Sequence, residues 1–164
     1  IDEMFHGQVK TVASSPYAIE EHCLQADLVV GGVLIPGAAA PKLVTDAMVA
    51  KMKPGSVLVD VAIDQGGCFE DSKATTHQDP TYKVHDAIFY CVANMPGAVP
   101  RTSTIALTNA TLPFAIQIAE KGWKQACTDS VPLRKGLNVV NGKIVYKGVS
   151  EAFDLPYTEV ENML

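Results

Sequence analysis

Residues 56–70 constrain the fold of this chain more than any other stretch of its sequence. Residues 57–59 form an apolar run, Val-Leu-Val, that closely follows a Lys-Pro-Gly turn. Such a run is typical of a strand that is buried on both faces, as in a parallel sheet. Asp60 and Asp64 then flank three apolar residues, and two glycines follow at 66–67.

Asp64 is a candidate functional carboxylate because it lies just after this predicted strand. Open α/β sheets bind ligands beyond the carboxyl ends of their strands. Aspartate is also common in turns, where its side chain accepts backbone hydrogen bonds. The stretch by itself supports both interpretations, a working carboxylate and a loop cap, about equally.

Composition and charge indicate a globular protein and argue against two classes of partner. The chain has 164 residues, of which 48% are hydrophobic and 19% charged, as in a folded domain of ordinary size. The net charge is −5 at pH 7, and no basic patch points to a nucleic acid or an anionic membrane. No apolar run is long enough to span a bilayer and no signal-peptide pattern opens the chain, so we expect a cytoplasmic protein.

The cysteines and histidines favour no metal site. The four cysteines are Cys23, Cys68, Cys91 and Cys127. They are widely spaced and include no Cys-x-x-Cys pair, which favours free, buried thiols in a reducing compartment over a disulfide framework. Histidines and aspartates occur between residues 62 and 86, but without the spacing of a metal-binding motif, so we take them as solvated polar groups.

The beginning of the sequence predicts that more protein precedes it. The chain opens with Ile1 instead of Met, and residues 2–5 resemble the last turn of a helix. We therefore expect this sequence to be a fragment of a longer protein.

The order of the predicted elements indicates an α/β fold with part of a Rossmann-like, doubly wound parallel sheet. Strands are predicted at 9–12, 27–31, 56–61 and 87–92. Helices are predicted from Pro16 to about Leu24 and from Leu43 to Met52, and one long loop at 62–86. Alternating strands and helices are the pattern of a parallel sheet, so the loops at 32–41, 62–70 and 93–97 should lie on one edge.

The glycines after the second predicted strand are a weaker feature. Gly31, Gly32 and Gly37 fit neither the spacing Gly-x-Gly-x-x-Gly nor that of a Walker loop. Close approach of backbone at the edge of the sheet explains them better, although a ligand could also lie against such bare backbone.

After Pro100 the pattern changes to helix followed by hairpin. A long helix is predicted from Thr102 or Ser103 to Lys121, with a kink or a break at Pro113. Residues 138–146 predict a β-hairpin with an Asn-Gly turn, and residues 148–164 a short helix and a tail. We divide the chain accordingly into residues 1–100 and residues 101–164, the second of which looks like the returning end of another domain.

Five long segments of the sequence resemble alanine dehydrogenase. They are residues 29–37, 40–44, 52–70, 90–96 and 102–113. The first reads Val-Val-Gly-Gly-Val-Leu-Ile-Pro-Gly, and the third contains Val-Asp-Val-Ala-Ile-Asp-Gln-Gly-Gly-Cys-Phe-Glu. The resemblance covers essentially the whole chain but only the C-terminal part of the family's subunit. It implies that residues 1–100 are the second half of an NAD-binding Rossmann domain and residues 101–164 the C-terminal part of the substrate domain.

This resemblance implies a function and a set of site residues. It implies NAD-dependent, reversible oxidative deamination of L-alanine to pyruvate and ammonium, in a hexamer, with Asp64 as the catalytic carboxylate. The implied nucleotide contacts are Ser14, Val33, Leu34, Val61, Ala62, Ile63, Asp64, Lys73, Val92, Ala93, Asn94 and Met95. Lys73 stands where some members have Arg. Lys121 stands where some members have a metal-linked His, so no metal site is carried over.

The family's glycine fingerprint, its ribose-binding acidic residue and its first domain have no counterpart in this sequence. We therefore expect residues 1–164 alone to be inactive, since the first domain would hold the carboxylate of alanine. Two alternatives remain: the nucleotide-binding module of a transhydrogenase-like protein, and a dinucleotide-binding fragment without chemistry. Transhydrogenases tend to carry Glu-Thr where this chain has Asp64-Gln65, which favours the dehydrogenase.

Overall fold

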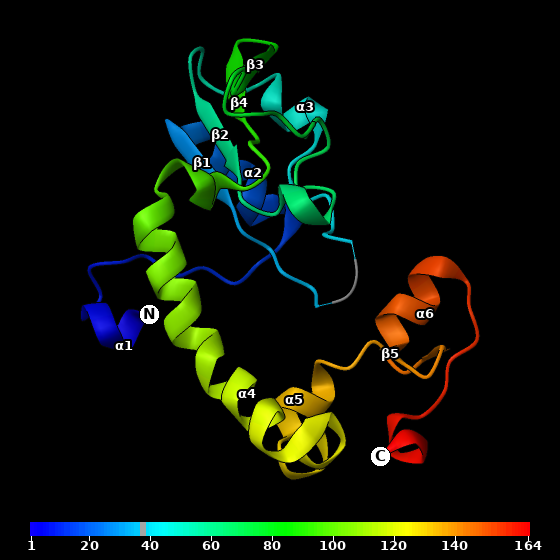
Figure 1. Cartoon of the computed structure of the whole chain (residues 1–164). Coiled ribbons are helices and arrows are strands. Elements are labelled where there is room, and N and C mark those ends of the chain that lie inside the picture. The colour runs from blue at the N-terminus through cyan, green and yellow to red at the C-terminus, as the bar shows by residue number, and fades with distance from the viewer. Residues whose placement is uncertain (37–38) are drawn as a thin grey trace. The chain divides into compact units, whose positions relative to one another are not determined.

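The computed structural model describes residues 1–36 and 39–164, so Gly37 lies outside the described residues. The chain forms two compact units (Figure 1). One unit comprises residues 1–34 and 39–95, and the described part of the other comprises residues 35–36 and 96–164. The first unit contains the sheet, and the second contains the long helix and the hairpin.

A four-stranded, mostly parallel sheet forms the centre of the first unit. Its strands are β1 (Leu28–Gly31), β2 (Val57–Asp60), β3 (Thr81–Val84) and β4 (Ala87–Tyr90), in the spatial order β1-β2-β4-β3. β1, β2 and β4 run parallel, and Val59 of β2 lies opposite Val30 on one side and Tyr90 on the other. The three parallel strands confirm the predictions at 27–31, 56–61 and 87–92. Because these strands are parallel, their carboxyl ends meet at one edge.

β3 corrects the prediction of one continuous loop at 62–86. It pairs antiparallel with β4 at the edge of the sheet, and His85, with φ 50°, lies in the short turn that joins the two strands. An edge strand is only half covered, so β3 alternates exposed and partly buried residues instead of forming an apolar run. In the sequence, the alternation of Tyr82 and Val84 with Lys83 is the pattern that could have predicted this strand.

The predicted strand at 9–12 is wrong. The chain begins with a single helical turn, α1 (Asp2–Phe5), and then runs without secondary structure to Ser15. Val9 and Val12 are exposed and pair with no strand of the described residues. A β-branched run forms a strand only where a neighbouring strand completes its hydrogen bonds.

Two helices pack against the core of this unit. α2 (Pro16–Gln25) begins behind Ser15 as predicted and buries Cys23. α3 (Asp46–Val49) is much shorter than the predicted helix 43–52. Val44 instead pairs with Phe69 in a parallel bridge, which keeps the chain extended before the Thr45 cap. Leu58 and Phe89 are fully buried at the centre of the core.

The cap of α2 can be tested by mutation. The Ser15 hydroxyl accepts a hydrogen bond from the N–H of Ala18 at 3.1 Å. We expect Ser15→Ala to lower the free energy of unfolding by about 1 kcal/mol, the usual cost of losing such a cap. Ser14→Ala is the matched control, since Ser14 is equally exposed and caps nothing. Equal losses in urea unfolding of the two variants would contradict the assignment of the cap.

The second unit consists of helices and a small hairpin. α4 (Pro100–Asp129) starts with a proline in its first turn and is followed by α5 (Val131–Lys135). β5 (Val139–Val140) and β6 (Lys143–Ile144) form the predicted hairpin, with Asn141 and Gly142 both at positive φ. α6 (Lys147–Phe153) and a 3₁₀ turn, η3 (Val160–Met163), complete the chain. None of the helices in the described ranges has both the length and the hydropathy needed to cross a membrane.

The interruption of α4 falls at Gly122 and not at Pro113. Gly122 has φ 74° and ψ 155°, outside the helical region, whereas Pro113 lies within the helix. Without a Cβ, glycine reaches positive φ at little cost, so the chain bends there most easily. The predicted break at Pro113 is therefore wrong, and the predicted helix end at Lys121 falls directly before the interruption.

Candidate functional site

A pocket of about 310 Å³ lies beyond the carboxyl ends of β1 and β2. Its walls come from two loops that follow these neighbouring strands. The lining residues are Gly32, Val33, Leu34, Val61, Ala62, Asp64 and Gln65. The two loops therefore meet at one edge of the sheet, as the parallel order of the strands predicted.

Asp64 presents its carboxylate at this pocket. It lies in a short 3₁₀ helix, η1 (Ile63–Gln65), and is exposed. Among the described residues, no group donates a hydrogen bond to its carboxylate, and no side chain caps the start of η1. The loop-cap interpretation of Asp64 therefore has no support in the geometry, and the carboxylate is free to meet a ligand.

The capping role belongs to Asp60 instead. Asp60 ends β2, is fully buried, and accepts hydrogen bonds from the backbone N–H groups of Ala62 at 3.0 Å and Cys68 at 2.8 Å. The hydroxyl of Ser72 also donates to it. Gly67 has φ 75°, and a Cβ there would stand 2.7 Å from the Asp60 Oδ2 atom, so the turn requires glycine.

The walls of the pocket are mostly apolar. Leu34 is 66% exposed and Val61 54% exposed, so both present apolar surface to a ligand. Gln65 adds a polar group, since its Oε1 atom is buried and has no hydrogen-bond partner among the described residues. A buried acceptor without a donor is costly, and because this atom is buried it is closed to a ligand in this conformation.

The structure brings together five of the residues that the resemblance implied. Val33, Leu34, Val61, Ala62 and Asp64 all line the pocket. Gly32, where the sequence left a ligand contact open, and Gln65, which sequence reasoning missed, line it as well. Gly32 is next to Val33 and Gln65 is next to Asp64, both of which the resemblance implied. Their positions just after predicted strands could have indicated that they line the pocket.

The other implied contacts do not line this pocket. Ile63 is buried in the core, and Ser14 lines a separate pocket of about 290 Å³ beside α2. Lys73 is exposed, and its backbone N–H donates to the Tyr82 hydroxyl at 2.8 Å.

Residues 92–95 follow β4 at the same edge of the sheet as the pocket. Val92 is buried, and the N–H of Ala93 donates to the Thr75 carbonyl at 3.1 Å. Asn94 has φ 61°, and its carbonyl lies 3.0 Å from Nε2 of His77. Met95 begins the 3₁₀ turn η2 (Met95–Ala98). None of these four residues lines the pocket that holds Asp64.

Cys68 belongs to the frame of the site. All four cysteines are free and buried, as predicted. The pKa of the Cys68 thiol is raised to about 11, first by burial and then by the nearby Asp60 carboxylate. The thiol is therefore protonated at neutral pH and is a poor nucleophile. Within the described ranges, no group of three or more His, Cys, Asp or Glu side chains could hold a metal ion.

The fold and the pocket define a class of protein, the α/β proteins that bind ligands beyond the carboxyl ends of parallel strands. Within this class, the chain belongs to a family whose model, "Alanine dehydrogenase/PNT, C-terminal domain", matches residues 1–147. The family assignment confirms the resemblance seen in the sequence.

Individual relatives agree with this assignment. Alanine dehydrogenases from Mycolicibacterium smegmatis and Halomonas elongata are each 58% identical to the whole chain, which corresponds to 44% of their length. The chain thus spans less than half the length of these curated relatives.

Two solved structures share the fold. A structure named L-alanine dehydrogenase matches 93% of this chain and 42% of its own with a TM-score of 0.77 and 44% identity. A transhydrogenase from Sinorhizobium meliloti matches 89% of this chain and 39% of its own with a TM-score of 0.66 and 26% identity.

Proposed function

We propose that this chain forms part of an NAD-dependent alanine dehydrogenase, which converts L-alanine reversibly to pyruvate and ammonium. The observation that carries the proposal is the exposed Asp64 carboxylate at an apolar pocket beyond β1 and β2. The 58% identity to alanine dehydrogenases over the whole chain supports the same reaction.

The residues of the pocket fit the nicotinamide end of a dinucleotide. Leu34 and Val61 offer apolar contact to a planar ring, and Gln65 adds a polar side chain at the same pocket. Val33 and Leu34 could add backbone contacts. Ser14, Lys73 and residues 92–95 complete the proposed nucleotide contacts, through the family resemblance. A bound nicotinamide supplies the hydride acceptor of the reaction.

Asp64 supplies the acid–base chemistry in this proposal. Oxidation at the α-carbon of alanine leaves positive charge on the substrate nitrogen, and hydrolysis then requires protons to move. A carboxylate at the pocket can stabilise that charge and can accept or return a proton. Its neighbour Asp60 cannot take this role, because it is fully buried and occupied by hydrogen bonds.

The proposal extends to organisation and partners. The boundary between the two units, at residues 95 and 96, supports a nucleotide-binding part up to about residue 100 and a following part that belongs to the substrate domain. We infer a cytoplasmic homo-oligomer, a hexamer as in the family, that uses no nucleic-acid or membrane partner. L-alanine and pyruvate would be held partly by a domain outside this chain.

A transhydrogenase-like nucleotide-binding module is the second candidate. The TM-score of 0.66 to the Sinorhizobium meliloti protein favours it. The sequence identity to that protein is 26%, however, whereas the identity to the L-alanine dehydrogenase structure is 44%. A nucleotide-binding chain without chemistry would retain the pocket and show no role for Asp64. Both alternatives predict no alanine-dependent reduction of NAD.

An enzyme assay tests the proposal. We expect a full subunit that contains this chain to reduce NAD when alanine is added, measured by the absorbance of NADH. Residues 1–164 alone should show no such reduction and should bind NAD much more weakly in calorimetric titration, because this sequence has no Gly-x-Gly-x-x-Gly turn for the pyrophosphate. Failure of the full subunit to reduce NAD with alanine would refute the proposed reaction. Micromolar binding by residues 1–164 alone would refute the predicted dependence on the rest of the subunit.

A further inference from the structure

Asp60 is a buried carboxylate that the proposed reaction does not use. Its relative exposure is 0%, and no Lys or Arg of the described ranges forms an ion pair with it. Hydrogen-bond donors alone stabilise the carboxylate. They are the N–H groups of Ala62 at 3.0 Å, Cys68 at 2.8 Å and Phe69 at 3.4 Å, together with the Cys68 thiol at 3.5 Å and the hydroxyl of Ser72.

These donors lie on both sides of Asp64 in the sequence. Ala62 precedes Asp64, whereas Cys68, Phe69 and Ser72 follow it. One carboxylate therefore holds both ends of the turn that carries η1 and Asp64. A rigid turn of this kind fixes the direction in which the Asp64 carboxylate points.

A second set of contacts holds the same turn from the outside. The Lys42 ammonium donates to the carbonyls of Gly66 at 2.6 Å and Gly67 at 3.0 Å. The N–H of Ala40 donates to the Gln65 carbonyl at 3.0 Å. The residues directly after Asp64 are therefore held from two directions.

We propose that Asp60 is the positioning residue of Asp64 and that the Ser72 hydroxyl completes its hydrogen-bond set. The inference rests on the proposed function of Asp64. Removing one of these hydrogen bonds lets the turn shift without removing any group that contacts a ligand. Catalysis is sensitive to such shifts, since a misplacement of about 1 Å can cost about 100-fold in rate.

The chemistry of the side chain explains why a carboxylate is needed. Both oxygens of an ionised carboxylate accept hydrogen bonds, whereas an asparagine has one acceptor and one donor group. In Asp60→Asn the amide N–H₂ would face at least one of the donors from Cys68, Ala62 or Ser72. We expect this variant to lower kcat by about 10- to 100-fold and to leave the KM for NAD nearly unchanged.

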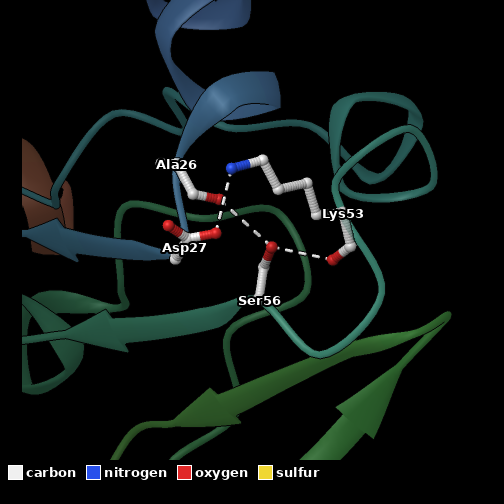
Figure 2. A network of polar contacts seen from close by, with 4 residues as sticks. All are labelled: Ala26, Asp27, Lys53 and Ser56. Carbon is white, nitrogen blue, oxygen red and sulfur yellow. Dashed lines mark hydrogen bonds and ion pairs between the residues drawn. The ribbon is translucent and has the colours of Figure 1, made fainter.

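Ser72→Ala is the second variant, since it removes one hydroxyl and leaves the buried carboxylate in place. Its matched control is Ser56→Ala, at the opposite end of β2 (Figure 2). Ser56 is 3% exposed, and its Oγ atom lies 2.7 Å from the Lys53 carbonyl and 3.2 Å from the Ala26 carbonyl. An ion pair of 2.9 Å between Lys53 and Asp27 lies beside it. This network lies at the amino ends of β1 and β2, whereas the Asp64 turn lies beyond their carboxyl ends.

The test is a cycle of variants in a full subunit that contains this chain, with kcat and KM measured for each. We expect Ser72→Ala to lower kcat by roughly tenfold with the KM for NAD unchanged, and Ser56→Ala to leave kcat unchanged. In an Asp64→Asn background, Ser72→Ala should cause no further loss, because its effect passes through Asp64.

Two results would overturn the inference. One is that Ser72→Ala lowers kcat by the same factor in the wild type and in the Asp64→Asn background. The other is that Ser56→Ala lowers kcat as much as Ser72→Ala does. Either would show that the hydrogen bonds only support the fold. Wild-type turnover of Asp64→Asn would instead refute the proposed function of Asp64, and the inference with it, so the two failures are distinguishable.

Discussion

Replacement of Asp64 by asparagine, in a full subunit that contains this chain, is expected to lower turnover by about 10²- to 10⁴-fold, the usual contribution of a general acid–base group. Asparagine keeps the shape of the side chain but can neither carry the charge nor transfer the proton. NAD should still bind, because the apolar residues and backbone of the pocket are unchanged. Steady-state kinetics with alanine, together with a titration of NAD, separates the two effects.

Asp79→Asn is the matched control for this variant. Asp79 is also exposed, lies between β2 and β3, and does not line the Asp64 pocket. We expect it to retain the turnover of the wild type. Wild-type turnover of Asp64→Asn would contradict the catalytic assignment, and loss of both turnover and NAD binding would indicate a damaged pocket instead.

Gly31→Ala is expected to destabilise the protein by about 1–3 kcal/mol, the usual range for overpacking a core. Gly31 ends β1, and a Cβ there would stand 2.3 Å from the Cys68 Sγ atom and 2.7 Å from the ring of Phe69. Both neighbours are buried, so neither can move without disturbing the core. Because Cys68 donates to Asp60, the strain would also reach the Asp64 turn.

The adjacent glycine provides the control. A Cβ on Gly32 would meet no heavy atom of the described residues within 4 Å, and Gly32 does not have positive φ. We therefore expect Gly32→Ala to change the free energy of unfolding by less than about 0.5 kcal/mol, as for a surface substitution. Urea unfolding of both variants measures the difference, and equal stabilities would show that Gly31 is not needed for close packing.

Local sequence patterns predicted those elements whose causes are local. The apolar run at 57–59 became β2, the Ser15-Pro16 pair began α2, and Asn141-Gly142 became the hairpin turn. In each case, residues within a few positions of each other set the backbone conformation. The α/β fold class followed from the order of these elements, and the family followed from long segments of sequence.

Contacts between distant residues account for the errors. The run at 9–12 has no strand beside it, and β3 forms because β4 offers it a partner. α3 is short because Val44 pairs with Phe69, which lies far along the chain. A strand or a bridge depends on its partner, and the partner is not encoded in the segment itself.

Asp60, the last residue of β2, and Asp64, just after it, show the same difference between local and tertiary causes within the site. The sequence by itself determined that two carboxylates lie four residues apart beyond a buried strand, and it left both roles open for Asp64. Only the tertiary structure showed that Asp60 is the cap, because Cys68, Phe69 and Ser72 fold back to donate hydrogen bonds to it, whereas Asp64 stays exposed at the pocket. It likewise distinguished Gly31, packed against Cys68 and Phe69, from Gly32, which has open space around it. A carboxylate or a glycine has the same local preferences at either position, so its surroundings determine what it does.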